Sequence, residues 1–159
     1  QVAHFGKAFG MRVIAWSHNL NKEDCEKINV EYVSGLDLFK LSDILSIHTR
    51  LSDRTIGFIN KDKLKLMKKS SVLVNTSRGP IINEKDLIDS LNSGVISFAA
   101  LDVYDQEPLP KDHILRKTKN TILTPHIGYV SYEAYEKFFT GYLLVIEAFL
   151  NKAPINQIN

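Results

Sequence analysis

The chain of 159 residues is long enough to bury a hydrophobic core, and its formal net charge is only +2, with lysines and arginines scattered along it. Scattered basic residues argue against a nucleic-acid-binding protein, and no apolar run reaches the roughly 20 residues that span a bilayer. The single cysteine, Cys25, excludes an internal disulfide and favours a reducing cytoplasm. Its acidic neighbours favour a structural role over that of a nucleophile.

Short apolar runs that predict strands alternate with segments that predict helices. The apolar runs lie at residues 13–16, 31–33, 44–47, 72–74, 98–101 and 121–123. The helical segments lie at residues 1–9, 22–28, 36–41, 61–67, 84–91 and 132–150. Asn60 and Asn83 stand where side chains cap helices, and Gly10 stands where a helix ends. This alternation predicts an α/β fold with a Rossmann-like, doubly wound parallel sheet.

Polar and charged residues follow the predicted strands. They are Ser17, His18, His48, Thr49, Thr76, Ser77, Arg78, Asp102, Glu107 and His126. Parallel strands end at a common edge of the sheet, and the ligands of open α/β sheets bind outside that edge. We therefore expect a functional site there.

One arginine stands at this edge in the stretch from Ser71 to Pro80. The apolar run 72–74 predicts a strand that is buried on both faces, and Gly79-Pro80 interrupts regular structure directly after it. Arg78 is therefore expected on a turn. Taken alone, it is either an ordinary surface residue of a βα turn or a group that grips a ligand.

Arg78, Glu107 and His126 together suggest a specific chemistry. A guanidinium grips a carboxylate through two parallel hydrogen bonds, and a histidine can give or take a proton at neutral pH. A neighbouring carboxylate favours the charged imidazolium, and so raises the pKa of such a histidine. This set suits a substrate that carries a carboxylate next to a carbonyl or hydroxyl group. In isolation, His126 could instead cap a turn and Glu107 could be a solvated loop residue.

The other histidines give weaker signals. His48 and His126 could form a metal pair, but no further histidine or cysteine stands at ligand spacing, so we predict no metal site. We expect His4 and His113 to be surface residues without partners.

Three motifs occur in a fixed order: Val74-Asn75-Thr76-Ser77-Arg78-Gly79-Pro80, the segment from Ala99 to Pro108, and Thr124-Pro125-His126-Ile127-Gly128. Through these motifs, and over essentially its whole length, the chain resembles the D-isomer-specific 2-hydroxyacid dehydrogenases. The resemblance implies that Arg78 binds the substrate carboxylate and that His126 is the acid/base. Glu107 would pair with the histidine.

The resemblance also implies NAD as the cofactor, with Asp102 holding the nicotinamide carboxamide. The cofactor-binding residues that we expect are Ser17, Thr49, Thr76, Ser77, Arg78, Asp102, His126, Ile127 and Gly128. An acidic residue usually ends the second strand of such domains and takes the ribose hydroxyls of NAD. Here Ser17 follows that strand, and a serine would not repel a 2′-phosphate, so NADP stays open.

The glycine-rich turn that cradles the dinucleotide pyrophosphate in this family has no counterpart in the sequence. Residues 1–6 resemble the helix that follows that turn. We therefore expect part of a dehydrogenase subunit, without the first strand and glycine-rich turn and inactive by itself. Residues 1–130 would form the truncated nucleotide-binding domain. Residues 131–159 would form a long helix and tail that return to the substrate domain.

The implied reaction is reversible hydride transfer between NAD(P)H and a 2-keto or 2-hydroxy acid. The expected protein is a cytoplasmic homodimer without nucleic-acid or membrane partners. The alternative is a non-catalytic remnant of the family that senses dinucleotides or binds another protein. Arg50 stands where many relatives carry a proline, and it either holds a phosphate or is simply exposed.

Overall fold

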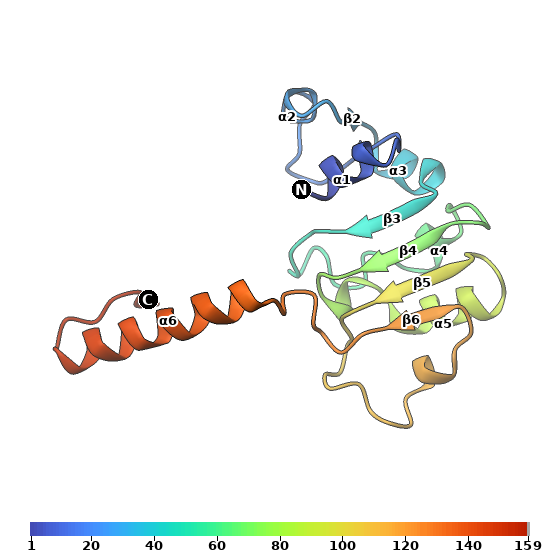
Figure 1. The fold of residues 1–159 in the computed structure, drawn as a ribbon. Coiled ribbons are helices and arrows are strands. Elements are labelled where there is room, and N and C mark those ends of the chain that lie inside the picture. Colours follow the sequence, from blue (N-terminus) through green and yellow to red (C-terminus); the bar gives the residue numbers. More distant parts are fainter. Residues whose placement is uncertain (159) are drawn as a thin grey trace. The chain divides into compact units, whose positions relative to one another are not determined.

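The computed structural model describes residues 1–158 of the chain. They divide into two compact units, the first comprising Gln1–Pro125 and the second beginning at His126. The first contains all the strands and the hydrophobic core, and the second is dominated by one long helix (Figure 1).

The elements lie close to the predicted ranges. The strands are β1 (Ile14–Ala15), β2 (Glu31–Tyr32), β3 (Ile44–Ile47), β4 (Val72–Asn75), β5 (Phe98–Leu101) and β6 (Thr121–Leu123). The α-helices are α1 (Val2–Ala8), α2 (Lys22–Lys27), α3 (Gly35–Leu41), α4 (Lys61–Leu64), α5 (Glu84–Asn92) and α6 (Tyr132–Leu150). Short 3₁₀ turns occupy Gly79–Ile81 (η1) and Ile114–Lys117 (η2).

Local sequence determines where helices α4 and α5 begin and where α4 ends. The side-chain oxygen of Asn60 accepts a hydrogen bond from the Lys63 amide, and that of Asn83 accepts one from the Asp86 amide, as predicted. Helix α4 is shorter than predicted and ends at Leu64. The amides of Leu66 and Met67 bond three residues back rather than four, which tightens the chain into a turn.

All strand pairs are parallel. β3, β4, β5 and β6 form one sheet in that order, and β1 and β2 form a separate short sheet. The arrows of β3 to β6 therefore point the same way (Figure 1). The parallel α/β fold is confirmed. Among residues 1–158, β1 pairs only with β2, and β3 pairs only with β4. Each of these two strands therefore has one unpaired edge.

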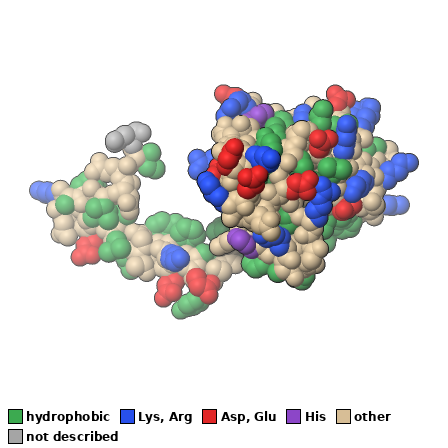
Figure 2. Space-filling view, turned by 90° about the horizontal axis from the view of Figure 1, so that it is seen from above, with side chains coloured by type: hydrophobic (Ala, Val, Ile, Leu, Met, Phe, Trp, Pro, Cys, Tyr) green, Lys and Arg blue, Asp and Glu red, His purple; other side chains and the backbone are tan. Residues whose placement is uncertain are grey.

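The core of the first unit lies around β4. Leu73 of this strand is fully buried, as are Leu64 of α4 and Ile81 of η1, and Leu87 of α5 and Leu115 of η2 are almost fully buried. β4 is an interior strand of its sheet, which explains its short apolar run. On the surface of the first unit, Lys and Arg side chains are interspersed with Asp and Glu (Figure 2).

Helix α6 in the second unit is apolar on most of its surface. None of its residues is buried, and its exposed large hydrophobic side chains include Phe139, Leu143 and Phe149. The Ser131 hydroxyl caps its first turn by accepting a hydrogen bond from the Ala134 amide. Within residues 1–158, no helix is both long enough and apolar enough to cross a membrane.

Candidate active site

The ends of β3 and β4 are joined by a side-chain bond. The Ser77 hydroxyl donates to the Thr49 carbonyl at 2.5 Å, across two neighbouring strand ends. Both residues are half-buried. The two turns that leave the sheet here are thereby held together, which gives this edge a defined shape.

Asn75 builds the turn that presents Arg78. The Asn75 side chain is 1% exposed, its Oδ1 accepts the Ser77 amide at 3.0 Å, and its Nδ2 donates to the Arg78 carbonyl at 2.9 Å. A buried amide that is satisfied on both sides fixes the backbone around it. Within the motif Val74–Pro80, Asn75 therefore stabilises the turn that carries Arg78.

The Arg78 side chain is exposed, and not all of its guanidinium N–H groups are used in hydrogen bonds within the chain. One guanidinium nitrogen donates to the Ser77 carbonyl at 2.6 Å. Within residues 1–158, no carboxylate lies within ion-pair distance of Arg78. A guanidinium has five N–H donors in a planar fork, so the remaining ones can grip an added carboxylate.

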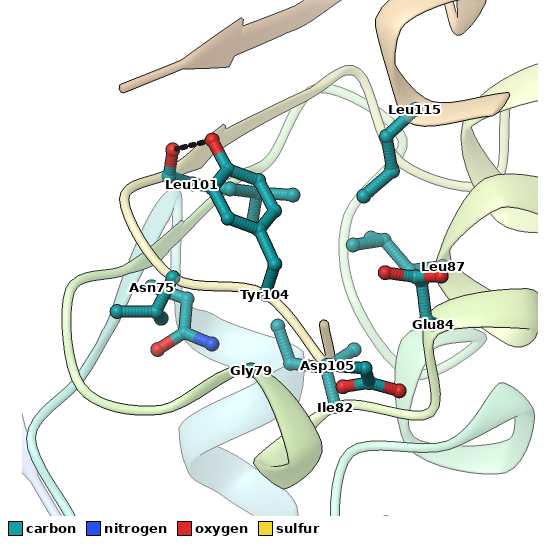
Figure 3. A pocket seen from close by; sticks show the side chains of 10 residues that line it. Asn75, Gly79, Ile82, Glu84, Leu87, Leu101, Tyr104, Asp105 and Leu115 are labelled. Carbon is teal, nitrogen blue, oxygen red and sulfur yellow. Dashed lines mark hydrogen bonds between the residues drawn. The ribbon is translucent and has the colours of Figure 1, made fainter. Parts of the chain in front are cut away.

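Gly79 allows the arginine turn to lie against the chain that leaves β5. A Cβ at this position would overlap the carbonyl group of Tyr104 and would lie 2.5 Å from the Asp105 amide nitrogen. Figure 3 shows this close approach, around a cavity of about 10 Å³ that also contacts Glu84 and Leu115. That volume holds roughly one water molecule, so the cavity belongs to the packing beneath the site.

The segment after β5 is held by hydrogen bonds to its own residues and to Thr124. The Tyr104 amide donates to Glu107 Oε1 at 2.9 Å, and the Tyr104 hydroxyl donates to the carbonyls of Leu101 and Thr124. Burial, followed by the nearby charge of Asp102, raises the pKa of the Tyr104 hydroxyl, so it remains a donor. The loop that carries Glu107 is thus anchored at the end of the sheet.

Asp102 is the buried acid of this edge. Its side chain is 6% exposed, and one carboxylate oxygen accepts a hydrogen bond from the Thr124 hydroxyl. Its amide donates to the Asn75 carbonyl, which continues the ladder between β4 and β5. Asp102 therefore has a fixed position at the ends of these strands.

His126 begins the second unit. Its backbone φ is +55°, a left-handed conformation that is uncommon outside glycine and is often found at functional sites. Its ring is half-buried and meets the ring of Tyr129 edge-on, with 6.0 Å between centroids. Ile127 and Gly128, which follow it, are exposed.

The remaining predicted cofactor residues lie at strand ends. Ser17 is half-buried just after β1, and Thr76 is exposed just after β4. The structure thus brings Thr49, Ser77 and Arg78 together at one edge of the sheet. The bond from the Asp102 amide to the Asn75 carbonyl connects this edge to the segment that carries Asp102 and Glu107. The prediction that these residues share a strand-end edge is supported within the first unit; their roles stay predictions.

The expectation that His113 has no partner is wrong. His113 Nε2 lies 3.2 Å from a Glu84 carboxylate oxygen, and both side chains are about four-fifths buried. Burial raises the pKa of Glu84, and His113 opposes that shift. The two residues are 29 positions apart, and only the packing of the loop before η2 onto α5 brings them together.

The family follows from comparison with known proteins. The family model for the D-isomer specific 2-hydroxyacid dehydrogenase NAD binding domain matches residues 1–128. The chain belongs to this family. Known members are NAD-dependent oxidoreductases acting on 2-hydroxy acids. The chain spans about half the length of the curated relatives it matches.

Individual relatives of this dehydrogenase domain differ in substrate. Glyoxylate reductase of Aeropyrum pernix is 42% identical over 100% of this chain and 48% of its own length. A D-lactate dehydrogenase of Aquifex aeolicus, solved with NAD and lactic acid, is 29% identical with a TM-score of 0.82; the match covers 96% of this chain and 50% of that one. An acyclic imino acid reductase solved with NADPH and D-Arg is 34% identical with a TM-score of 0.77, over 99% of this chain and 49% of that one.

The residues of this dehydrogenase domain fit one part of a dinucleotide. Thr76 offers an exposed hydroxyl, and Asp102 offers a fixed carboxylate that can accept a hydrogen bond from an amide. Both stand at the carboxyl ends of parallel strands, where such ligands bind. Within residues 1–158 no glycine-rich turn leads from a strand into a helix, so the described residues include no such turn to hold a pyrophosphate.

Proposed function

We propose that the protein carrying this chain reduces a 2-keto acid to a 2-hydroxy acid, reversibly, with a nicotinamide dinucleotide. One observation carries the proposal. Arg78 is exposed, has no carboxylate partner within residues 1–158, and is held by the buried Asn75 at the edge where Asp102 is fixed. In a chain of this family, that arrangement leaves a guanidinium available to a substrate.

In this proposal, Arg78 binds the substrate carboxylate through paired N–H donors and polarises the adjacent carbonyl group. The cofactor, when bound, supplies or accepts the hydride. His126 gives a proton to the carbonyl oxygen during reduction and removes it during oxidation. Proton transfer of this kind contributes typically 10²–10⁴-fold in rate.

Glu107 is proposed to orient His126 and to favour its charged form. Its loop is anchored through the Tyr104 amide, which donates to Glu107 Oε1 at 2.9 Å. Chain continuity supports the pairing, since only Thr124 and Pro125 separate His126 from the end of β6. Asp102 and Thr76 are proposed to hold the nicotinamide carboxamide. Ser17, Thr49, Ser77, Ile127 and Gly128 remain proposed cofactor contacts.

The proposal is tested on the full-length protein with glyoxylate and hydroxypyruvate, the substrates named for its relatives. Arg78→Gln should lower kcat/KM about 10²-fold or more, mainly through KM, because a buried or bound carboxylate loses a charged partner. His126→Gln should lower kcat about 10²–10⁴-fold. NADH affinity should fall less than kcat/KM in either variant.

Arg54→Gln is the matched control, because Arg54 is an exposed arginine in the turn that follows β3. This variant should keep wild-type kinetics. Normal kcat/KM in both Arg78→Gln and His126→Gln would refute the assigned roles. Tight NADH binding without turnover in the wild-type protein would support the non-catalytic alternative instead.

The domain arrangement is also a proposal. We propose that a further strand of the longer protein pairs between β1 and β3, which would join the two parallel sheets through their unpaired edges. The apolar surface of α6 fits a helix that packs on a substrate domain. A homodimer in the cytoplasm remains our prediction, and light scattering that shows only monomer would contradict it.

A further inference from the structure

The carboxyl end of β1 carries an aromatic cluster that the sequence did not predict. Trp16 stacks on Phe58 with 5.8 Å between centroids and 12° between planes. The His18 ring meets both rings edge-on, at 4.9 Å from Trp16 and 5.8 Å from Phe58. Lys63 Nζ lies 4.3 Å from the Phe58 ring centroid. The cluster therefore holds the His18 ring in a defined orientation.

The backbone around His18 forms a tight turn. The Leu20 amide donates to the Ser17 carbonyl at 3.3 Å, so His18 and Asn19 occupy the tip of the turn and both are exposed. Ser17 is half-buried at its base. The turn thus presents a hydroxyl and an imidazole to solvent at the end of a parallel strand.

No carboxylate belongs to this turn. The next acidic residues along the chain are Glu23, Asp24 and Glu26 on α2. Asp24 pairs with Lys27 at 2.7 Å, and Glu26 lies 3.6 Å from Lys22. Two of the three acids therefore already have lysine partners on their own helix.

The absence of an acid at this position bears on cofactor choice. In dinucleotide-binding α/β domains, a carboxylate at this strand end bonds the adenosine ribose of NAD, and its charge disfavours a 2′-phosphate. A serine hydroxyl can donate to a phosphate oxygen. A histidine can donate from a ring nitrogen and can carry a positive charge.

We propose that Ser17 and His18 form the subsite for the 2′-phosphate of NADPH, so that this dehydrogenase accepts NADPH at least as well as NADH. His18 is the principal donor, and the Trp16–Phe58 stack orients it. This inference rests on the proposed function, because it assumes that the adenosine end of a cofactor lies at the end of β1.

The chain provides its own reporter for this subsite. Trp16 is its single tryptophan, and its ring lies 4.9 Å from that of His18. A ligand bound at His18 should therefore change the Trp16 emission, independently of turnover. In the full-length protein, Trp16→Phe identifies the part of the signal that comes from this residue.

The test is equilibrium titration of the full-length protein with 2′,5′-ADP and with 5′-AMP, which differ only in the 2′-phosphate, followed by NADPH and NADH. We expect 2′,5′-ADP to bind at least tenfold more tightly than 5′-AMP. His18→Ala should weaken 2′,5′-ADP at least fivefold and change 5′-AMP less than twofold. His18→Lys should retain the preference for 2′,5′-ADP, which separates loss of the donor from loss of the fold.

Two further variants sharpen the test. Ser17→Asp should weaken 2′,5′-ADP at least tenfold while leaving 5′-AMP bound, because it restores a repelling carboxylate. His4→Ala, at an exposed histidine on α1, is the matched control and should change neither affinity. Equal binding of the two nucleotides, or a His18→Ala variant with unchanged 2′,5′-ADP affinity, would overturn the inference. Failure to bind either NADH or NADPH would instead refute the proposed function.

Discussion

Replacing Gly79 by alanine tests whether the arginine turn depends on close backbone approach. The added Cβ would overlap the Tyr104 carbonyl and lie 2.5 Å from the Asp105 nitrogen, whereas ordinary contacts begin near 3.4 Å. The chain after β5 must therefore move by more than about 0.9 Å, because the contact with the Tyr104 carbonyl is closer still. Because the obstacle is backbone rather than the end of a flexible side chain, no change of rotamer relieves it.

The expected cost can be worked out from these contacts. Overpacking costs typically about 1–3 kcal/mol. Moving Tyr104 also weakens the 2.9 Å bond from its amide to Glu107, which adds about 0.5–1.5 kcal/mol. We expect a loss of about 3 kcal/mol. For a unit of this size, that lowers Tm by about 6–12 °C.

The assay is thermal unfolding followed by circular dichroism, with Gly94→Ala as the matched control. Gly94 has φ of +70° and open space around its Cβ position, so alanine there meets only backbone strain of about 1 kcal/mol. Gly79→Ala should be clearly less stable than Gly94→Ala. It should also lose catalytic efficiency, since displacement of about 1 Å near a site can cost about 10²-fold. Equal Tm values for the two variants would refute the close-approach argument.

Three further predictions concern other buried groups. Tyr104→Phe should lower Tm by about 2–6 °C, because two backbone carbonyl groups lose their shared donor, and an unchanged Tm would contradict this. Cys25 should react slowly with iodoacetamide until the protein is denatured, because burial and two acidic neighbours raise its pKa, and rapid labelling of folded protein would count against it. Glu84→Gln should raise Tm relative to wild type more at pH 8 than at pH 4. Burial raises the Glu84 pKa, so the wild type bears a charge penalty above the folded pKa that vanishes below the unfolded pKa; a difference independent of pH would argue against this sign.

The candidate site could be predicted in outline because its signals are local. The apolar run 72–74 predicts a strand, and Gly79-Pro80 predicts the turn after it. Neither prediction depends on residues elsewhere in the chain. Parallel strand order then places successive strand ends at one edge. Arg78 and Asp102 were found in this way, since each follows its own strand directly.

Other features depended on contacts between segments that are distant in the sequence. The pairing of His113 with Glu84 was missed because neither residue belongs to a motif, and only the packing of the loop onto α5 brings them together. The ring of His18 likewise acquires its orientation from Phe58, which is 40 positions away. No local pattern contains either contact.

The sequence by itself determined the parallel α/β class, most element ranges, and the identity of the residues at strand ends, because periodicity, caps and breaks act over a few residues. Only the tertiary structure decided why Gly79 must be glycine and what fills the space around Tyr104. It also showed that β1–β2 and β3–β6 form separate sheets. These properties depend on the distances between segments, and chain order alone does not specify those distances.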